Sequence, residues 1–313
     1  MLYSMDQFNH IDINPEFARA LTIMEGRQHV FITGRAGTGK STLLSYFRAR
    51  AKKRVAVLAP TGVAALNVHG QTLHSFFGFQ PDITIEKAKE RAKRMKGKGE
   101  RAQLYQKLEA IVIDEVSMVR ADLLDCVDVF LRGARAMPRT PFGGVQMIFI
   151  GDLYQLPPVV SGKSERAAFS SHYESPYFFS SHAFQECVCE FVELQKIYRQ
   201  RDQDFIDILN AVRNRSITDA HLLQLNRRVD EVFEPPANEF YITLTPTNAE
   251  AGAINTLRLR ELKGKLFQAQ AFITGDFDVK QAPTELHLEV KPGAQVMMLN
   301  NDREGRWVNG TVG

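Results

Sequence analysis

Cysteines are scarce in this chain, and their number limits the setting in which it works. The 313 residues include Cys126, Cys187 and Cys189, an odd number that gives no complete disulfide framework. A reduced, cytoplasmic setting is therefore favoured. No second Cys/His pair stands at metal-ligand spacing, so the sequence predicts no structural zinc site.

Long hydrophobic runs are also missing, which argues against a membrane protein. No apolar stretch approaches the length needed to cross a bilayer, although 44% of the residues are hydrophobic. The N-terminal segment MLYSMDQFNHIDINPEF is polar and acidic, and it lacks the apolar core of a secretory signal. We therefore expect no membrane partner.

Strong net charge is the third feature that the chain lacks. The formal net charge is +3, but residues 86–108 contain nine Lys/Arg against three Glu, so the rest of the chain is net negative. A uniformly basic coat for nucleic acid is therefore excluded. The basic segment is interpreted as a solvated helical insert, with a local basic patch as the alternative.

Glycine, by contrast, recurs within one short segment that has the pattern of a phosphate-binding loop. In HVFITGRAGTGKS (residues 29–41) an apolar run ends in a glycine, the spacing Gly-x-x-x-x-Gly-Lys-Ser follows, and a helix-forming run begins after it. Strand, glycine loop and helix N-terminus form a cradle of backbone N–H groups for phosphate. Lys40 would reach the β- and γ-phosphates of ATP, and the Ser41 hydroxyl would bind Mg²⁺. The predicted nucleotide-binding residues are Gly34, Ala36, Gly37, Thr38, Gly39, Lys40, Ser41 and Thr42.

Short apolar segments alternate with helical patterns through the first 200 residues. Segments that are apolar on both faces and separated by helices predict an α/β fold, with a parallel sheet between two helix layers. Ligands of such sheets bind at the carboxyl ends of the strands, where Gly34, Thr61, Asp114 and Asp152 stand. The predicted strands are 29–33, 54–59, 111–114, 145–151 and 188–193.

A second unit is predicted to begin near residue 201. Apolar residues at helical spacing indicate one helix over 202–213, and a second helix is expected over 245–262. FYITLT (240–245) has the composition of a strand, and the chain becomes β-like from residue 266. The two predicted domains are therefore 1–200 and 201–313.

Two carboxylates follow the apolar run of the third predicted strand. Asp114 fits the ligand of a magnesium-bound water opposite a phosphate loop, and Glu115 is placed to polarise the attacking water. The alternative is an acidic helix start, where negative charge favours the helix dipole. We predict the catalytic arrangement because the glycine loop belongs to the same sheet.

Three further polar residues follow the fourth and fifth predicted strands. In GDLYQLPPV (151–159), Gln155 can contact a γ-phosphate and orient water, whereas Asp152 could face the same crevice or a DNA groove. Arg199 in LQKIYRQ can clamp a transferring phosphoryl group. The plainer interpretations are a proline-terminated loop and a surface arginine.

The segment APTGVAALNVHGQTLHSFFGF (59–79) combines hydroxyls, a histidine and phenylalanines. Hydroxyls and backbone N–H groups suit the phosphates of a nucleic-acid strand, and aromatic rings suit base stacking. We predict nucleic-acid contact for Thr61 and His74. The core is predicted to take Phe76, Phe77 and Phe79, with base stacking as the alternative.

The order of these segments resembles the Pif-one family of superfamily-one DNA helicases, in the RecD-like branch. GRAGTGKS, PTGVAALN, DEVSM, GDLYQLPPV, LQKIYRQ and LTPTNAEAGAIN carry the resemblance, from about residue 28 to residue 313. It implies a RecA-like P-loop lobe with the ATP site, followed by a partial second RecA-like lobe. It also implies a monomeric 5′-to-3′ helicase that uses ATP and Mg²⁺ to move along single-stranded DNA, in DNA repair and telomere maintenance.

The resemblance assigns roles to individual residues. The catalytic positions of the family match Lys40, Glu115, Gln155 and Arg199. The metal positions match Ser41 and Asp114. The segments along the DNA path match Thr61, His74 and Asp152. The family's signature helix falls where Arg132 and Arg135 stand, and these basic residues are candidates to face DNA.

Two departures from the family pattern change what we expect. Phe17 stands where the family has an adenine-reading glutamine, so it either stacks on the base or packs in the core. The sequence ends in NGTVG, before the remaining second-lobe motifs of the family. We therefore expect this chain to bind Mg-nucleotide, to hydrolyse it slowly and not to unwind duplex. A nucleotide-binding regulatory protein and a small-molecule phosphotransferase are the alternatives.

Overall fold

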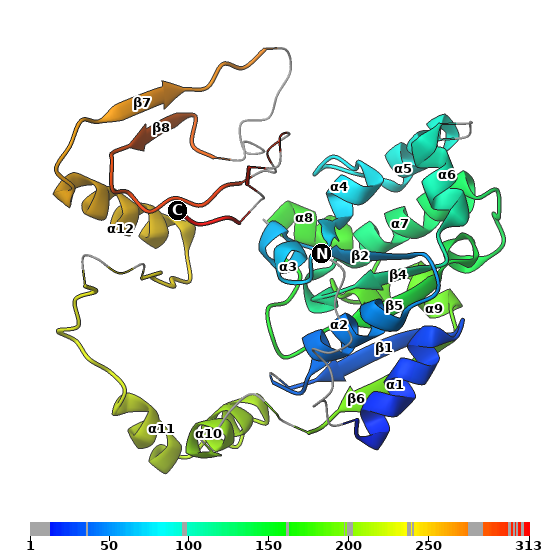
Figure 1. The fold of residues 1–313 in the computed structure, drawn as a ribbon, viewed down its shortest axis with the longest axis horizontal. Coiled ribbons are helices and arrows are strands. Elements are labelled where there is room, and N and C mark those ends of the chain that lie inside the picture. Colours follow the sequence, from blue (N-terminus) through cyan, green and yellow to red (C-terminus); the bar gives the residue numbers. More distant parts are fainter. Residues whose placement is uncertain are drawn as a thin grey trace. The chain divides into compact units, whose positions relative to one another are not determined.

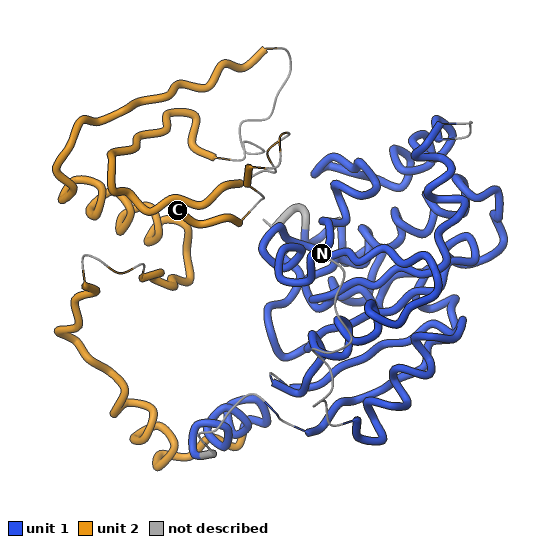
Figure 2. Tube along the Cα trace, in the orientation of Figure 1, with its two compact units in different colours: residues 1–215 blue, residues 216–313 orange. Residues whose placement is uncertain are grey.

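The chain divides into two compact units, residues 1–215 and residues 216–313, which Figure 2 colours separately. Helix α10 (Gln203–Arg213) belongs to the first unit, so this division falls later than the predicted one at residue 200. The computed structural model describes residues 13–35, 37–95, 99–160, 163–196, 198, 203–236, 239, 241–274, 284–299, 302, 304, 306–307 and 310–313.

A six-stranded parallel sheet forms the centre of the first unit (Figure 1). The strand order is β3-β2-β4-β5-β1-β6, and each neighbouring pair is parallel. Five of these strands confirm the predicted ones, whereas β3 has only two residues, too few to leave a periodic pattern in the sequence. The bounds are β1 (His29–Gly34), β2 (Val55–Ala59), β3 (Gln71–Thr72), β4 (Ala110–Ile113), β5 (Gln146–Ile150) and β6 (Cys189–Leu194).

Alternate residues of the strands point into two separate cores, one on each face of the sheet. Phe31 and Ile113 belong to one core, and their chain neighbours Ile32 and Val112 belong to the other. Successive side chains of a strand point to opposite faces, so a strand that is apolar throughout must be covered on both sides. Helices α1 and α2 contribute to one core and α5, α7 and α9 to the other, which confirms the predicted α/β fold.

Polar side chains set where several helices of this unit begin. Asn14, Thr61, Thr72 and Thr84 each accept a hydrogen bond from the backbone N–H three residues later, at the starts of α1, α3, α4 and α5. Such caps satisfy N–H groups that the helix itself leaves unpaired. The bounds are α1 (Pro15–Glu25), α2 (Lys40–Arg50), α3 (Gly62–Asn67), α4 (Leu73–Phe77), α5 (Ile85–Arg94), α6 (Glu100–Lys107), α7 (Ala121–Ala134), α8 (Lys163–Ser170) and α9 (His182–Glu186).

The basic segment 86–108 folds as α5 and α6. Helix α5 buries only Ala88 and Ala92, and its neighbour is α7, where a Cβ on Gly133 would lie 2.7 Å from the Ala92 Cβ. Such a close approach needs small residues on both helices. Lys89 and Lys93 are exposed, as expected for a solvated helical insert. Among the described residues, no helix combines the length and apolar character that a bilayer span requires.

The second unit contains two helices and a small antiparallel ribbon in its described part. These elements are α11 (Asp219–Asn226), α12 (Asn248–Glu261), β7 (Phe267–Gln270) and β8 (His287–Val290). The strand predicted over 240–245 is wrong for residues 241–245, which form no strand. Leu244 is 91% exposed there, and a strand persists only when another strand pairs with its backbone.

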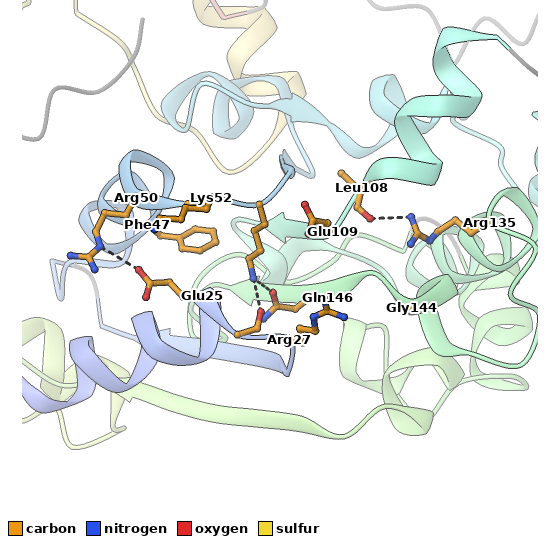
Figure 3. Close-up of a pocket in the computed structure, with 13 residues that line it drawn as sticks. Glu25, Arg27, Phe47, Arg50, Lys52, Leu108, Glu109, Arg135, Gly144 and Gln146 are labelled. Atoms are coloured by element: carbon orange, nitrogen blue, oxygen red, sulfur yellow. Dashed lines mark hydrogen bonds and ion pairs between the residues drawn. The ribbon is translucent and has the colours of Figure 1, made fainter.

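A cavity of about 640 Å³ opens at the amino-terminal edge of the sheet, where β2, β4 and β5 begin (Figure 3). Two of the basic side chains that line this cavity are bound to acceptors of the protein itself. Lys53 donates to the carbonyl oxygens of Met24 and Gly26 and to the Gln146 side chain. Arg50 pairs with Glu25. These bonds join the end of α1 to the starts of β2 and β5, at the edge opposite the predicted ATP site.

Candidate nucleotide site

The loop between β1 and α2 depends on glycine at two positions. Gly39 precedes α2 with φ = 88°, a left-handed backbone that glycine adopts without strain. At Gly34, a Cβ atom would lie 2.6 Å from the carbonyl oxygen of Leu194 in β6 and 2.6 Å from Thr38 Oγ1. Any larger residue at either position would therefore change the path of the loop. The predicted loop residue Ala36 lies outside the described residues.

The N-terminus of α2 offers hydrogen-bond donors to this loop. The helix starts at Lys40 without a side-chain cap, and Ser41 and Thr42 are exposed. The first N–H groups of a helix have no partner within the helix, so they and the helix dipole favour an anion. Lys40 Nζ donates to the carbonyl oxygens of Gly34 at 2.7 Å and Arg35 at 3.0 Å. The amine is therefore folded back over the loop that phosphates would occupy.

Asp114 and Glu115 follow β4 at the same edge of the sheet. Asp114 is 7% exposed, and Glu115 has φ = 50°. A left-handed backbone at a residue with a side chain costs about 1–3 kcal/mol, and such strain is concentrated at functional sites. Burial, and then the charge of Glu115, raise the pKa of Asp114 to about 6, whereas the charge of Lys40 opposes this rise. The amine and the two carboxylates therefore lie close enough to influence one another.

The acidic pair fits a magnesium–nucleotide complex better than a metal held by protein alone. Among the described residues, no group of three or more His, Cys, Asp or Glu could hold a metal ion. Magnesium is commonly bound by one or two carboxylates together with substrate phosphates. Asp114 is buried beside a second negative charge, at the sheet edge where α2 begins. The Ser41 hydroxyl lies in the first turn of α2, and these residues suit such a complex.

The raised pKa predicts that Asp114→Asn stabilises the nucleotide-free chain at pH 7. The folded-state pKa of about 6 exceeds the ordinary 3.8, so folding disfavours the ionised carboxyl. This cost is absent below about pH 4 and grows as the pH rises to about 6. Its upper bound at pH 7 is about 3 kcal/mol. Urea unfolding of the wild type and of Asp114→Asn, at about pH 4 and at pH 7, measures the difference in their free energies of unfolding. An equal difference at both pH values would contradict the prediction.

Asp152 and Gln155 follow β5, beside the acidic pair. The Asp152 carboxylate accepts hydrogen bonds from the Tyr154 N–H at 3.1 Å and from Gln155 Nε2 at 3.1 Å. Arg213 of α10 donates to both oxygens, at 2.6 and 2.7 Å. Burial would raise the pKa of Asp152, but these hydrogen bonds, that of Arg213 first, hold the pKa below its usual value. The carboxylate is therefore held by its own loop and by α10, and its charge acts on the pKa of Lys40, while the contact of Asp152 with DNA stays a prediction.

The segment after β2 uses part of its polar chemistry for its own fold. Thr61 caps α3, a local role that explains threonine here without any ligand. His74 is partly buried in α4, and burial lowers its pKa, which keeps the ring mostly neutral at pH 7. Nucleic-acid contact by these two residues stays a prediction. The core position predicted for Phe76, Phe77 and Phe79 is confirmed.

The basic residues of α7 have partners within the first unit. Arg132 pairs with Asp128 at 2.7 Å and with Glu186 at 2.6 Å. Arg135 donates to the carbonyl oxygen of Gly143 at 2.7 Å and to carbonyls at the end of α6. Both guanidinium groups therefore connect α7 to neighbouring segments of the first unit. This structural role explains the two arginines without the DNA contact that was considered for them.

Two aromatic residues lie near the loop, and the structure decides between the two alternatives for one of them. Phe17 is 2% exposed and packs edge-to-face on Tyr46, so it takes the core position rather than stacking on a base. The Tyr198 N–H donates to the Gly37 carbonyl at 2.9 Å, and its ring would lie 3.6 Å from a Cβ on Gly39. The contact of Tyr198 with the loop was not predicted from the sequence, and the neighbouring predicted site residue Arg199 lies outside the described residues.

The parallel sheet, the glycine loop before α2 and the acidic pair after β4 define a RecA-like P-loop protein. Residues 16–222 match the family described as PIF1-like helicase, and the chain belongs to this family. "ATP-dependent DNA helicase PIF1" of Emericella nidulans is 34% identical over 311 residues, covering 93% of this chain and 39% of that protein. "ATP-dependent DNA helicase Pif1" of Bdellovibrio bacteriovorus is 31% identical over 326 residues, covering 100% of this chain and 69% of that protein.

Solved structures give the same family. The crystal structure of Pif1 helicase from Bacteroides in complex with ADP-AlF3 and single-stranded DNA has a TM-score of 0.82 and 35% identity, covering 97% of this chain and 69% of that one. The chain spans only 39% and 35% of the PIF1 proteins of Emericella nidulans and Saccharomyces cerevisiae that it matches.

Proposed function

We propose that this chain is the ATP-binding part of a DNA helicase that hydrolyses Mg-ATP and moves along single-stranded DNA with 5′-to-3′ polarity. The observation that carries the proposal is the meeting of Lys40, Asp114 and Glu115 at the carboxyl edge of one parallel sheet. Family membership and the Bacteroides complex with ADP-AlF3 and single-stranded DNA support it further.

The loop and α2 would bind the triphosphate. Lys40 would leave the two loop carbonyls and donate to the β- and γ-phosphates, while Ser41 and Asp114 would hold Mg²⁺, directly and through water. When bound, the metal neutralises charge that develops on the phosphoryl oxygens. Tyr198, beside the loop, is placed to stack on the base.

Hydrolysis would use residues at the ends of β4 and β5. Glu115 is the proposed base that takes a proton from the attacking water. Gln155 would contact the γ-phosphate and orient that water, and Arg199 is proposed as the cationic clamp on the transferring group. The strained backbone at Glu115 supports its role, because it fixes the direction of a side chain that must meet a water molecule.

We propose that single-stranded DNA passes over the segment that follows β2, with Thr61 and His74 as contacts. Both residues stand at or after the carboxyl ends of strands, on the side where the nucleotide would bind. Asp152 is assigned to the nucleotide instead, because Arg213 and Gln155 occupy its carboxylate. Contacts to DNA phosphates release counterions, so affinity for single strands should fall steeply with salt.

Steady-state ATP turnover with and without single-stranded DNA tests this function. We expect turnover to need Mg²⁺, to rise with DNA, and to do so less at high salt. Nucleotide binding with no effect of DNA would favour a regulatory protein over a motor. Transfer of phosphate to a nucleoside would favour a small-molecule phosphotransferase. Either result would count against the helicase proposal.

We further propose a monomeric, cytoplasmic protein. The contacts described at the proposed ATP site all lie within residues 1–215, so this site can form within one copy of the chain. The three cysteines are free thiols, and this supports a reducing compartment. Sedimentation of the nucleotide-bound chain tests the first point, and fractionation of cells tests the second.

A further inference from the structure

Arg213 makes an ion pair that ties α10 to the proposed ATP site. Its guanidinium lies 2.6 and 2.7 Å from the two Asp152 oxygens, and it stacks on the Tyr154 ring at 4.0 Å from the centroid. The side chains of Arg213 and Asp152 are 14% and 3% exposed, so water screens this pair little. The pair therefore fixes both the position and the net charge of the loop after β5.

Helix α10 holds Arg213 in a defined place. Ile206, Ile208 and Ala211 of this helix are buried, and Arg213 is its last residue. A side chain at the end of a packed helix has few alternative positions. The helix follows β6 and the segment that contains Arg199, so it lies at the end of the first unit. Arg213 thus links the end of the first unit to the loop that carries Gln155.

Three carboxylates, those of Asp152, Glu115 and Asp114, act on the charge of the Lys40 amine. Burial lowers the pKa of the Lys40 amine, the charges of Asp152, Glu115 and Asp114 oppose this change, and the charge of Arg213 adds to it. If Arg213 were absent, Asp152 would be a buried carboxylate without a strong partner. The amine of Lys40, whose pKa the Asp152 charge already affects, would then be drawn to this carboxylate at the expense of phosphate. Asp152 also holds Gln155 Nε2 at 3.1 Å, so any shift of the carboxylate moves the glutamine as well.

We propose that Arg213 is a positioning residue for ATP hydrolysis with two separable effects. Its charge neutralises Asp152 and so leaves Lys40 free for phosphate. Its two-oxygen contact with Asp152 and its stacking on Tyr154 hold Gln155 where the γ-phosphate would lie. This inference rests on the proposed function, because both effects act on the nucleotide site.

Two substitutions separate charge from geometry in the 313-residue chain. Arg213→Gln removes both, and we expect affinity for a non-hydrolysable Mg-ATP analogue to fall about tenfold and single-turnover hydrolysis to fall about 10–100-fold. Arg213→Lys keeps the charge but loses the guanidinium plane that stacks on Tyr154. Its affinity should stay within about threefold of the wild type, while hydrolysis falls about tenfold. Arg215→Gln is the control, because the side chain of this neighbouring exposed arginine makes no hydrogen bond or ion pair with the described residues, and its backbone bond to Val212 is unaffected by the substitution.

A second readout distinguishes positioning from simple damage to the fold. Because Gln155 would act on the γ-phosphate, Arg213→Lys should reduce the preference for the ATP analogue over ADP, which general unfolding would not do. Adding Asp152→Asn to Arg213→Gln removes the unpaired carboxylate. Affinity for the analogue should then return to within about threefold of the wild type, because Lys40 has lost its competitor.

The outcomes separate this inference from the proposed function. Wild-type affinity and hydrolysis in both Arg213 variants, with the wild-type chain active, would overturn the role of Arg213 alone. A double variant no better than Arg213→Gln, although its melting temperature matches the wild type, would also overturn it. A wild-type chain that binds no Mg-nucleotide would overturn the proposed function and this inference together.

Discussion

Replacing Lys40 with alanine is expected to weaken Mg-ATP binding by about two orders of magnitude and to reduce hydrolysis below detection. A charge-assisted contact to phosphate in a site shielded from water contributes about 2.7–4 kcal/mol. The substitution also leaves Asp114 and Glu115 without the amine that offsets them, so their negative charge would repel the triphosphate. The fold should persist, since among the described residues Lys40 donates only to two carbonyls of its own loop.

Titration with a fluorescent ATP analogue and single-turnover hydrolysis measure these effects. Lys52→Ala is a matched control, because this exposed lysine borders the cavity at the opposite edge of the sheet. The control should bind nucleotide like the wild type and melt at a similar temperature. Affinity of Lys40→Ala within about threefold of the wild type would contradict the placement of the phosphates on this loop.

Glu115→Gln is expected to reduce hydrolysis by about 10²–10⁴-fold while nucleotide binding is kept or improved. Glutamine has the shape of glutamate but cannot take a proton from water, so the loss falls on the chemical step. Binding should not suffer, because the substitution removes one of the charges that raise the pKa of Asp114. A carboxylate that ionises more readily binds Mg²⁺ better.

The comparison of binding and rate decides this second prediction. Both are measured on the same preparation, with and without single-stranded DNA, and Glu100→Gln on the exposed start of α6 is the control. Hydrolysis by Glu115→Gln at more than about a tenth of the wild-type rate would show that another group acts as the base. Equal losses in affinity and rate would indicate damage to the site rather than loss of a proton acceptor.

The sheet could be predicted from the chain because its strands carry a strong local signal. Apolar residues at every position of a short segment between helices have few explanations other than a strand buried on both faces. The ends of those strands then indicated the functional edge, since Gly34, Asp114 and Asp152 each follow one. The charges of Asp152 and Asp114 both act on the pKa of the Lys40 amine, which agrees with the expected meeting of these residues, while their roles at the site stay predictions.

Features that depend on distant partners could not be predicted in this way. The apolar segment 241–245 has strand composition but forms no strand, because pairing and not composition creates a strand. The sequence pattern allowed Arg132 and Arg135 to face DNA, but in the fold Arg132 pairs with Glu186 and Arg135 donates to carbonyls at the end of α6. The position of Thr61 after a strand suggested a ligand contact, and its capping of α3 was not predicted.

Patterns within a few residues of each other, such as a glycine loop before a helix or carboxylates after a strand, are set by local backbone geometry and can be recognised in the chain alone. The partner of Asp152 is of another kind, because Arg213 stands 61 residues later and reaches it through the packing of α10. A charge pair separated so far along the chain forms only when burial brings both groups together, and no local pattern records that distance. The sequence alone therefore determines where the loop that would hold ATP lies. The charge balance around Lys40 is decided only by the tertiary structure, because it depends on the pair of Arg213 and Asp152.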